Sequence, residues 1–287
     1  TERWPGQPSA WAIGGGAACT LLLDGEPAIT GYVDQVERGF EKEATHVDVI
    51  GRDRTADVVD CCADPGEFTD LTLDRLARRL VAPYDIDVLV TPGTDVGAPF
   101  HRWAVEPGER IWESLERAAR QRALLMITDG NGRILITRAG HNDQGAALVE
   151  GESVVGASYR DDVAQRYHIY KGLGQSGDER WSEAAGNAHQ EAEITDPQIR
   201  APRRLVFTAE DNADGVSMRQ RTEWERNVRR GRGQTATVKV QGFSAVPGQL
   251  WQPNLMVPVR LPSLGLSTRM LIVSVKYSLT TEAGRET

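Results

Sequence analysis

Apolar and polar residues alternate along both ends of the chain, and glycine or proline separates the short apolar runs. Residues 18–40 contain an apolar run, a turn at Asp24–Pro27 and a second, alternating segment. Residues 45–53 continue the alternation, with Val47 and Val49 on one face and polar residues on the other. The pattern predicts an antiparallel meander of strands with one sheet face toward water.

Helical spacing appears in the middle of the chain. Leu73, Leu76 and Leu80 recur at helical spacing after a capping residue, Asp70 or Thr72. Pro83 ends this predicted helix, and a strand is expected over residues 86–90, directly after it.

The clearest local unit is a helix followed by a hairpin, over residues 106–140. Pro107 lies near the helix start, and Ile111, Leu115 and Ala118 or Ala119 form an apolar stripe. The segments ALLMIT and RILIT follow, joined by DGNG, whose glycines and asparagine suit the positive φ of a tight turn.

The remainder predicts mostly strands, interrupted by one polar helix. Residues 176–203 are poor in large aliphatic side chains and predict a long exposed loop. A polar helix over residues 217–233 is closed by Gly231. Strands are expected at 153–160, 165–175, 204–210, 235–243, 254–262 and 269–280.

Composition narrows the possible partners and cofactors. The 287 residues include 41 acidic and 33 basic ones, and this net charge of −8 argues against a general affinity for nucleic acid or anionic lipid. There is no apolar run of membrane-spanning length and no secretory signal, so a cytoplasmic origin is expected. The three cysteines and five histidines lack disulfide or zinc spacing, so we expect no cofactor and no metal; they are Cys19, Cys61, Cys62, His46, His101, His141, His168 and His189.

An acidic cluster over residues 51–70 is the first candidate for chemistry, since paired carboxylates hydrolyse glycosides. Its members are Asp53, Asp57, Asp60, Asp64, Glu67 and Asp70. Such a pair needs an apolar pocket to raise one pKa, and nothing in the segment supplies one. The pattern DVVDCC instead suits the edge of a strand, with Arg52 and Arg54 placed to pair with neighbouring acids.

Three other patterns are candidate sites. The glycines at 14–16 lack the Lys-Ser/Thr of a phosphate loop and predict a flexible segment leading into the first strand. The polar helix carries Arg219, Arg221, Arg226, Arg229, Arg230 and Arg232. Interleaved Glu223 and Glu225 favour a solvated face or a subunit contact, while contact with nucleic acid or an acidic partner stays open. Trp103, Trp181, Trp224 and Trp251 could line a carbohydrate groove but are more typical of core or interface anchors. No G-x-S-x-G or H-E-x-x-H occurs, and no catalytic residue is assigned.

Three stretches in order carry a resemblance to a known family. They are GRDRTADVVDCCA, GERIWESLERAARQRALLMITDGNGRILITRAG and ATVKVQGFSAVPGQLWQPNLMVPVRLPSLGLSTRMLIVSVKYSLT. Together they resemble the baseplate hub proteins of Mu-like bacteriophages, relatives of contractile-tail hubs and of the base of type VI secretion spikes. Residues 176–203 match little of that pattern.

The resemblance implies a structural protein, not an enzyme. It implies a mainly β, α+β chain with two barrel-like tube domains, and a homotrimeric ring between the tail tube and a central spike. DNA would pass through the channel without specific binding, in a virion assembled in the host cytoplasm. Because no β-helical repeat follows the hub segments, we expect the spike to be a separate protein. Residues 51–70 would be a strand and turn of the first barrel.

The expected domains are residues 1–82 with 141–175 as a first barrel, 83–140 as an inserted helix-hairpin domain, and 204–287 as a second barrel after the 176–203 loop. Two alternatives remain open at this stage. One is a tail-borne peptidoglycan hydrolase that uses Asp57 and Asp60, and the other is a carbohydrate-binding module that uses Trp103 or Trp251.

Overall fold

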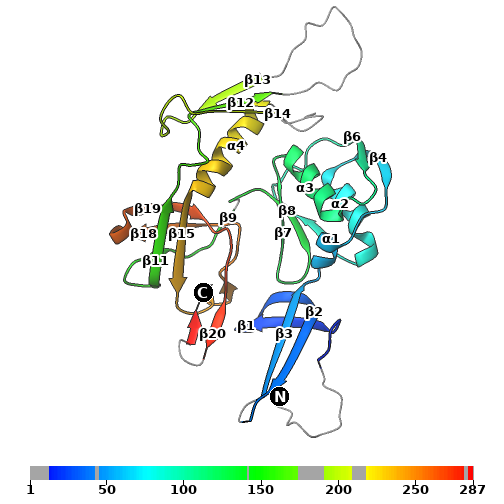
Figure 1. Ribbon diagram of the computed structural model, residues 1–287, viewed down its shortest axis with the longest axis vertical. Coiled ribbons are helices and arrows are strands. Elements are labelled where there is room, and N and C mark those ends of the chain that lie inside the picture. Colours follow the sequence, from blue (N-terminus) through cyan, green and yellow to red (C-terminus); the bar gives the residue numbers. More distant parts are fainter. Residues whose placement is uncertain are drawn as a thin grey trace, which may run out of the picture.

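A computed structural model describes residues 13–42, 45–140, 142–173, 191–208, 218–280 and 284–286. Figure 1 shows an elongated molecule with an N-terminal sheet at one end and a small sheet carrying a helix at the other. A helical unit and a second β unit lie side by side between them. In the described part of the chain, no helix has the length and apolar character needed to span a membrane.

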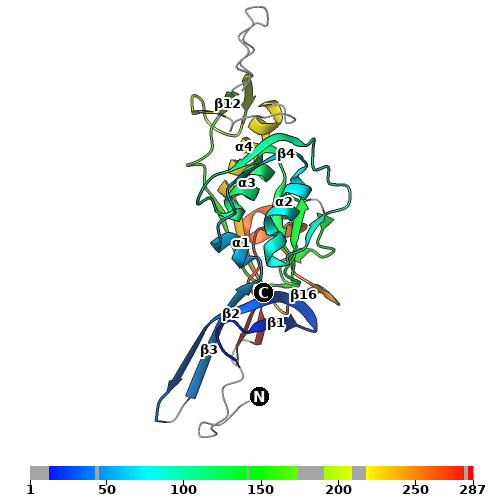
Figure 2. The ribbon, with the colours of Figure 1, turned by 90° about the vertical axis from the view of Figure 1, so that its right-hand side faces the viewer.

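The N-terminal sheet is the predicted antiparallel meander. It consists of β1 (Ala18–Leu23), β2 (Glu26–Phe40) and β3 (Thr45–Asp53) in that order. Asp24 and Gly25 form the first turn with positive φ, as the sequence predicts. Figure 2 shows that β2 and β3 extend past the rest of the molecule as an arm.

The helical unit follows directly. Its elements are α1 (Ala56–Asp60), β4 (Gly66–Leu71), α2 (Leu73–Val81), the 3₁₀ turn η1 (Ala82–Tyr84), β5 (Val88–Val90), β6 (Phe100–Val105), α3 (Ile111–Gln121), β7 (Leu125–Thr128) and β8 (Ile134–Thr137). β4 pairs with β6, while β8 lies between β5 and β7, parallel to β5. The predicted leucine stripe of α2 and the Ile-Leu-Ala stripe of α3 are buried in one core that spans residues 58–136. The backbone N–H of Arg110 donates to Glu113, which starts α3.

The second β unit joins residues from two distant parts of the chain. Its strands are β9 (Asn142–Asp143), β10 (Leu148–Val149), β11 (Val154–Asp161), β15 (Gln234–Val240), β16 (Ser244–Val246), β17 (Gln249–Leu250), β18 (Leu255–Leu261), β19 (Leu266–Leu271), β20 (Ser278–Thr280) and β21 (Gly284–Glu286), with the 3₁₀ turn η2 (Pro262–Leu264). β9 and β10 run parallel to β18, and β11 pairs with β15. Leu148, Val240 and Trp251 share its hydrophobic core.

A small sheet with one helix completes the fold. β12 (Ile169–Leu173) lies between β13 (Glu191–Thr195) and β14 (Arg204–Thr208), and α4 (Met218–Gly233) packs on this sheet. An added Cβ at Gly172 would lie 2.5 Å from the Thr222 hydroxyl, so this glycine lets the helix approach the central strand.

Two sequence predictions are wrong: the strand edge expected at DVVDCC, and the loop expected over residues 176–203. The segment DVVDCC is not a strand edge, because α1 occupies Ala56–Asp60. Asp53 accepts hydrogen bonds from the backbone and hydroxyl of Thr55, which turns the chain out of β3, and Val58 is then buried. The predicted loop, residues 176–203, contains the strand β13, whose buried side chain is Ile194. Residues 176–190 of this predicted loop lie outside the described residues.

Element boundaries differ from the sequence prediction at three further places. The polar helix α4 runs to Gly233 and not to Gly231. The predicted strand over 269–280 is interrupted, since residues 272–277 belong to no strand. Tyr277 holds this segment through side-chain contacts, because its hydroxyl donates to the Trp251 carbonyl and its ring meets Phe243 edge-on at 5.9 Å. The helix α2, expected in the first barrel-like domain, shares its core with residues 83–140.

Candidate assembly interface

The N-terminal sheet has one apolar and one polar face. Residues directly opposite in an antiparallel pair share a face, so the register assigns each side chain to a side. One side carries Cys19, Leu21, Ile29, Val33, Val36, Arg38, Phe40, Val47 and Val49. The other carries Thr20, Thr30, Tyr32, Gln35, Glu37, Asp48, Ile50 and Arg52. The sheet is therefore amphipathic, with Arg38 and Asp53 as polar members of the first side and Ile50 as an apolar member of the second.

Most of the apolar face is exposed to solvent. Leu21, Ile29, Phe40, Val47 and Val49 are all exposed large hydrophobic side chains, and Val33 at the base is the buried exception. An exposed apolar patch of this extent, on strands that project from the body, is typical of a protein–protein contact. The sequence placed Val47 and Val49 on one face correctly.

Side chains of the polar face contact the helical unit through an ion pair and a hydrogen bond. Arg52 binds the Asp34 carboxylate at 2.6 Å and the Asp60 carboxylate of α1 at 2.7 Å. The hydroxyl of Thr30 donates to the carbonyl of Gly130 in the β7–β8 turn at 2.9 Å. An added Cβ on Gly130 would lie 2.1 Å from the Pro27 carbonyl, so the sheet and the turn are in close contact.

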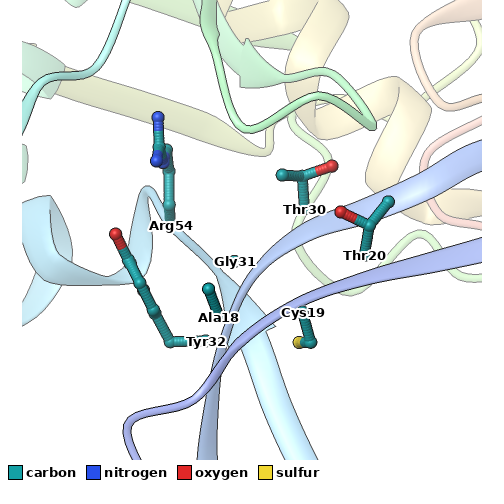
Figure 3. A pocket seen from close by; sticks show the side chains of 7 residues that line it. All are labelled: Ala18, Cys19, Thr20, Thr30, Gly31, Tyr32 and Arg54. Carbon is teal, nitrogen blue, oxygen red and sulfur yellow. The ribbon is translucent and has the colours of Figure 1, made fainter.

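A pocket of about 190 Å³ opens on this polar side. Figure 3 shows Thr20, Thr30 and Tyr32 directed to one side of the sheet, toward which Arg54 also points. Cys19 points to the other side of the sheet. The Arg54 guanidinium donates to the carbonyl of Asp85 at 3.2 Å. Because the pocket is small and none of the described residues that line it is acidic, we assign it no chemistry.

The acidic cluster is dispersed over the end of β3, α1, β4 and the turn between α1 and β4. Hydrogen bonds from Arg52 lower the pKa of Asp60, and those from Arg102 lower the pKa of Glu67. Asp70 lies 3.6 Å from His101, and Asp57 and Asp64 are exposed. A general acid needs a raised pKa, so the paired carboxylates are unsuited to that role. The described residues contain no group of three metal-ligating side chains.

Two of the tryptophans that could line a carbohydrate groove, Trp103 and Trp251, are packed inside the protein. Trp103 is buried, its indole N–H donates to Ser114 at 3.0 Å, and Arg117 stacks on its ring. Trp251 is buried in the second core. Their burial contradicts the carbohydrate-binding alternative for these two residues and confirms the anchor reading. Trp181 lies outside the described residues.

The arginines of α4 are partly used within the fold. Glu225 accepts from Arg221 at 3.1 Å and from Arg229 at 2.7 Å. Burial alone would raise the pKa of Glu225, and these two ion pairs outweigh it, so the pKa is lowered. Arg221 also lies over the rings of Trp224 and Phe207. Glu223 and Glu225 therefore pair with Arg219, Arg221 and Arg229, and the helix keeps an excess of positive charge.

Comparison with known proteins identifies the family. Residues 1–53 match the model for the Mu phage baseplate assembly protein GpP-like N-terminal domain, residues 55–138 the baseplate hub protein gp44-like second domain, and residues 215–287 the Mu phage GpP fourth domain. The 43 kDa tail protein of prophage MuSo2 from Shewanella oneidensis is 35% identical, with a TM-score of 0.83 over 98% of this chain and 83% of that chain. This chain belongs to the baseplate hub family of Mu-like phages.

Two further relatives agree with this assignment. The baseplate hub protein gp44 of Escherichia phage Mu is 29% identical over 268 residues, which cover 90% of this chain and 70% of the relative. A tail protein of Neisseria meningitidis MC58, 22% identical, shares the fold with a TM-score of 0.81 over 95% of this chain and 82% of that one. The hub chain is accordingly a structural tail protein and not an enzyme.

The hub assignment confirms the resemblance found in the sequence. The apolar sheet face was the feature that sequence reasoning missed, because alternation predicts which residues share a face but not what covers it. A usable signal was present, since Val36, Val47 and Val49 form an apolar stripe on strands that end in charge.

Proposed function

We propose that three copies of this chain form a ring in the baseplate, between the tail tube and a central spike. The observation that carries the proposal is the exposed apolar face of the N-terminal sheet. An uncovered apolar face on a two- or three-stranded arm is unfavourable in water, and a neighbouring subunit in the ring would bury it. Membership of the baseplate hub family supports a place for the chain in the baseplate.

The proposed ring uses two barrel-like units per chain, so that three chains present six units to a sixfold tube. The N-terminal sheet contributes to the first unit and strands from the second β core to the other. Among the described residues, both units have sheet edges that pair with no further strand, and completing barrels across subunits would remove those edges. The helical unit over residues 58–136 has its own core and lies beside the second β unit.

We propose that DNA passes through the ring without specific binding. The net charge of −8 favours repulsion of phosphate over retention. The partners are then other copies of the chain, a central spike protein and tail-tube or distal tail proteins. No membrane is involved. The protein is made in the host cytoplasm and ends in the virion.

Light scattering of the purified chain, with negative-stain images of the same fraction, tests the proposal. A particle of three times the 31.5 kDa chain mass with a central hole is expected. A mass of one chain at every concentration, with or without a co-expressed spike protein, would refute the ring. A basic channel wall in an image reconstruction would refute the account of DNA passage.

A further inference from the structure

The β7–β8 turn carries an asparagine directly followed by a glycine, a pair that occurs nowhere else in the sequence. Asn131 is the only asparagine that precedes a glycine, Gly132. Asn131 is exposed at the turn, whereas Gly132 is buried and lies against the N-terminal sheet. Figure 1 shows β7 and β8 reaching toward that sheet. An exposed amide therefore lies one residue from a contact between two parts of the fold.

Asparagine before glycine is the pair best able to lose ammonia without an enzyme. The backbone nitrogen of the glycine attacks the side-chain carbonyl carbon of the asparagine, and the new C–N bond closes a cyclic imide. The amide nitrogen leaves as ammonia and takes the hydrogen of the attacking N–H. Water then opens the imide at either carbonyl and gives aspartate or isoaspartate. Glycine favours the attack because it has no Cβ to block it and reaches backbone angles that other residues avoid.

The hydrogen bonds that oppose the attack at Asn131 are long. The Gly132 N–H donates to the Asp129 carbonyl at 3.2 Å, and the Asn131 amide donates to the Asp129 carboxylate at 3.4 Å. Both distances are at the weak end for such bonds. The base of the turn is held separately, since Asp129 and Arg133 share a backbone hydrogen bond and an ion pair. The peptide between residues 131 and 132 can therefore rotate while the hairpin stays paired.

The adjoining pair Asp129–Gly130 is protected from the same reaction. An aspartate closes the imide in its neutral form, because an ionised carboxylate resists attack by a nitrogen. Burial alone would raise the pKa of Asp129, but the hydrogen bonds from Arg133 and Asn131 outweigh it and lower this pKa. The carboxylate is also fixed in place, since it accepts the backbone N–H groups of Asn131 and Arg133 at 3.0 Å. The reactive residue of this turn is therefore Asn131.

The isoaspartate product does not suit the contact between the turn and the sheet. Isoaspartate routes the main chain through its own side chain and so adds a methylene group to the backbone between residues 131 and 132. At Gly132 even an added Cβ would lie 2.9 Å from the Thr30 carbonyl and 2.9 Å from Cγ of Arg54. A longer backbone in this packed position would push the turn away from the sheet. The hydrogen bond from the Thr30 hydroxyl to the Gly130 carbonyl would then be lost.

We propose that Asn131 is a site of spontaneous deamidation and that its isoaspartate form releases the N-terminal sheet from the β7–β8 turn. The inference does not depend on the proposed ring. The coupling acts in both directions, because the docked sheet restrains Gly132 and slows the attack on Asn131. A chain with a loosened sheet therefore deamidates faster, and a deamidated chain holds the sheet less firmly.

Peptide mass spectrometry of the full chain, incubated at mildly alkaline pH, tests the site. The peptide that contains residue 131 is expected to gain the mass difference between an amide and an acid, and electron-transfer fragmentation recognises isoaspartate in it. Asn227 is the internal control, since it is exposed but followed by Val228, whose branched side chain hinders the attack. A synthetic peptide over residues 128–134 sets the time needed for complete reaction without the fold.

Hydrogen exchange tests the coupling to the sheet. Exchange in β2 is expected to be faster in the aged chain than in the fresh chain, whereas Asn131→Ser, which forms no imide, should exchange alike before and after incubation. Thr30→Val removes the hydrogen bond to the turn and is expected to raise the deamidation rate about fivefold, by favouring the open turn. Thr20→Val is the matched control, because Thr20 pairs with Thr30 in register, and it should change the rate by less than about twofold.

The outcomes separate the two parts of the proposal. An amide that is retained at residue 131 after the synthetic peptide has fully reacted overturns the site. Deamidation that leaves exchange in β2 unchanged, or that proceeds equally fast in Thr30→Val and in Thr20→Val, overturns the coupling to the sheet.

Discussion

Replacing Asp196 with alanine should strongly destabilise the small sheet that carries α4. Asp196 is 5% exposed and binds the guanidinium of Arg166, which is 2% exposed, at 2.8 Å. The second carboxylate oxygen accepts the backbone N–H of Gln198 at 3.1 Å. Removing the carboxylate leaves the buried Arg166 charge without its counter-charge.

The size of the loss follows from the desolvation of that charge. Breaking a buried ion pair by removing one partner costs about 3–5 kcal/mol, because an ion remains in a low-dielectric site. Arg166 also donates to the Gln198 side chain at 2.8 Å, and this neutral contact compensates only in part. We therefore expect the free energy of unfolding of this unit to fall by about 3 kcal/mol or more.

Urea denaturation with hydrogen exchange at β12 measures the loss in this unit. The double variant Arg166→Met, Asp196→Leu is the control, since two apolar side chains of similar size should lie within about 1 kcal/mol of the wild type. A loss below about 1 kcal/mol for Asp196→Ala would refute the argument that the charge is desolvated.

The same pair predicts a dependence on pH. Burial alone would raise the pKa of Asp196, but the hydrogen bonds from Arg166 and Gln198 outweigh it and lower the pKa. A carboxyl group with a lowered folded-state pKa stabilises the fold above its unfolded pKa of about 3.9, and the contribution disappears as pH falls through the lower folded value. Denaturation of the wild type should therefore become easier below about pH 4, and less so in the double variant.

Three other predictions concern single contacts. Gly130→Ala should separate the β7–β8 turn from the N-terminal sheet, because the new Cβ would lie 2.1 Å from the Pro27 carbonyl, and faster hydrogen exchange in β2 would show it. Trp103→Phe should cost about 1–3 kcal/mol in urea denaturation, because the buried Ser114 hydroxyl loses its indole donor. Burial raises the pKa of Tyr277 to about 12, so its contribution to stability should be complete below about pH 10 and lost as pH rises through the folded value, as an ultraviolet absorbance titration can follow.

Each of these has a matched control. The new Cβ of Gly14→Ala would have no atom within 4 Å, so this substitution should leave hydrogen exchange in β2 unchanged. Ser114→Ala in the Trp103→Phe background should add little, because both partners of the hydrogen bond are then gone. Tyr277→Phe should lower the amplitude of the titration step near pH 12 by one phenol; the remainder belongs to Tyr84, whose pKa the hydrogen bond with Cys61 raises to about 12.

The sequence was informative where one local signal dominated. The leucines of α2, the stripe of α3 and the DGNG turn each predict their element from spacing alone, and the structure confirms all three. The segment DVVDCC misled because five residues fit a strand or a helical turn equally well, and the deciding Asp53–Thr55 turn lies outside the apolar pattern.

The interface could be predicted only in part. Alternation places Val47 and Val49 on one face, but whether that face meets a core or solvent depends on what packs there, and the chain folds its helical unit on the other side. β13 was missed for a related reason, since a single buried isoleucine among glutamates carries almost no periodic signal.

The continuity of the first core has a consequence for synthesis on the ribosome. Its buried residues all lie between Val58 and Ile136, so this unit can fold as soon as that stretch has emerged. The second core instead needs Leu148 to meet Val240 and Leu261, and β11 must wait for β15. Synthesis therefore orders the two cores: the helical unit can form before Val240 and Leu261, which the second β unit needs, have been made.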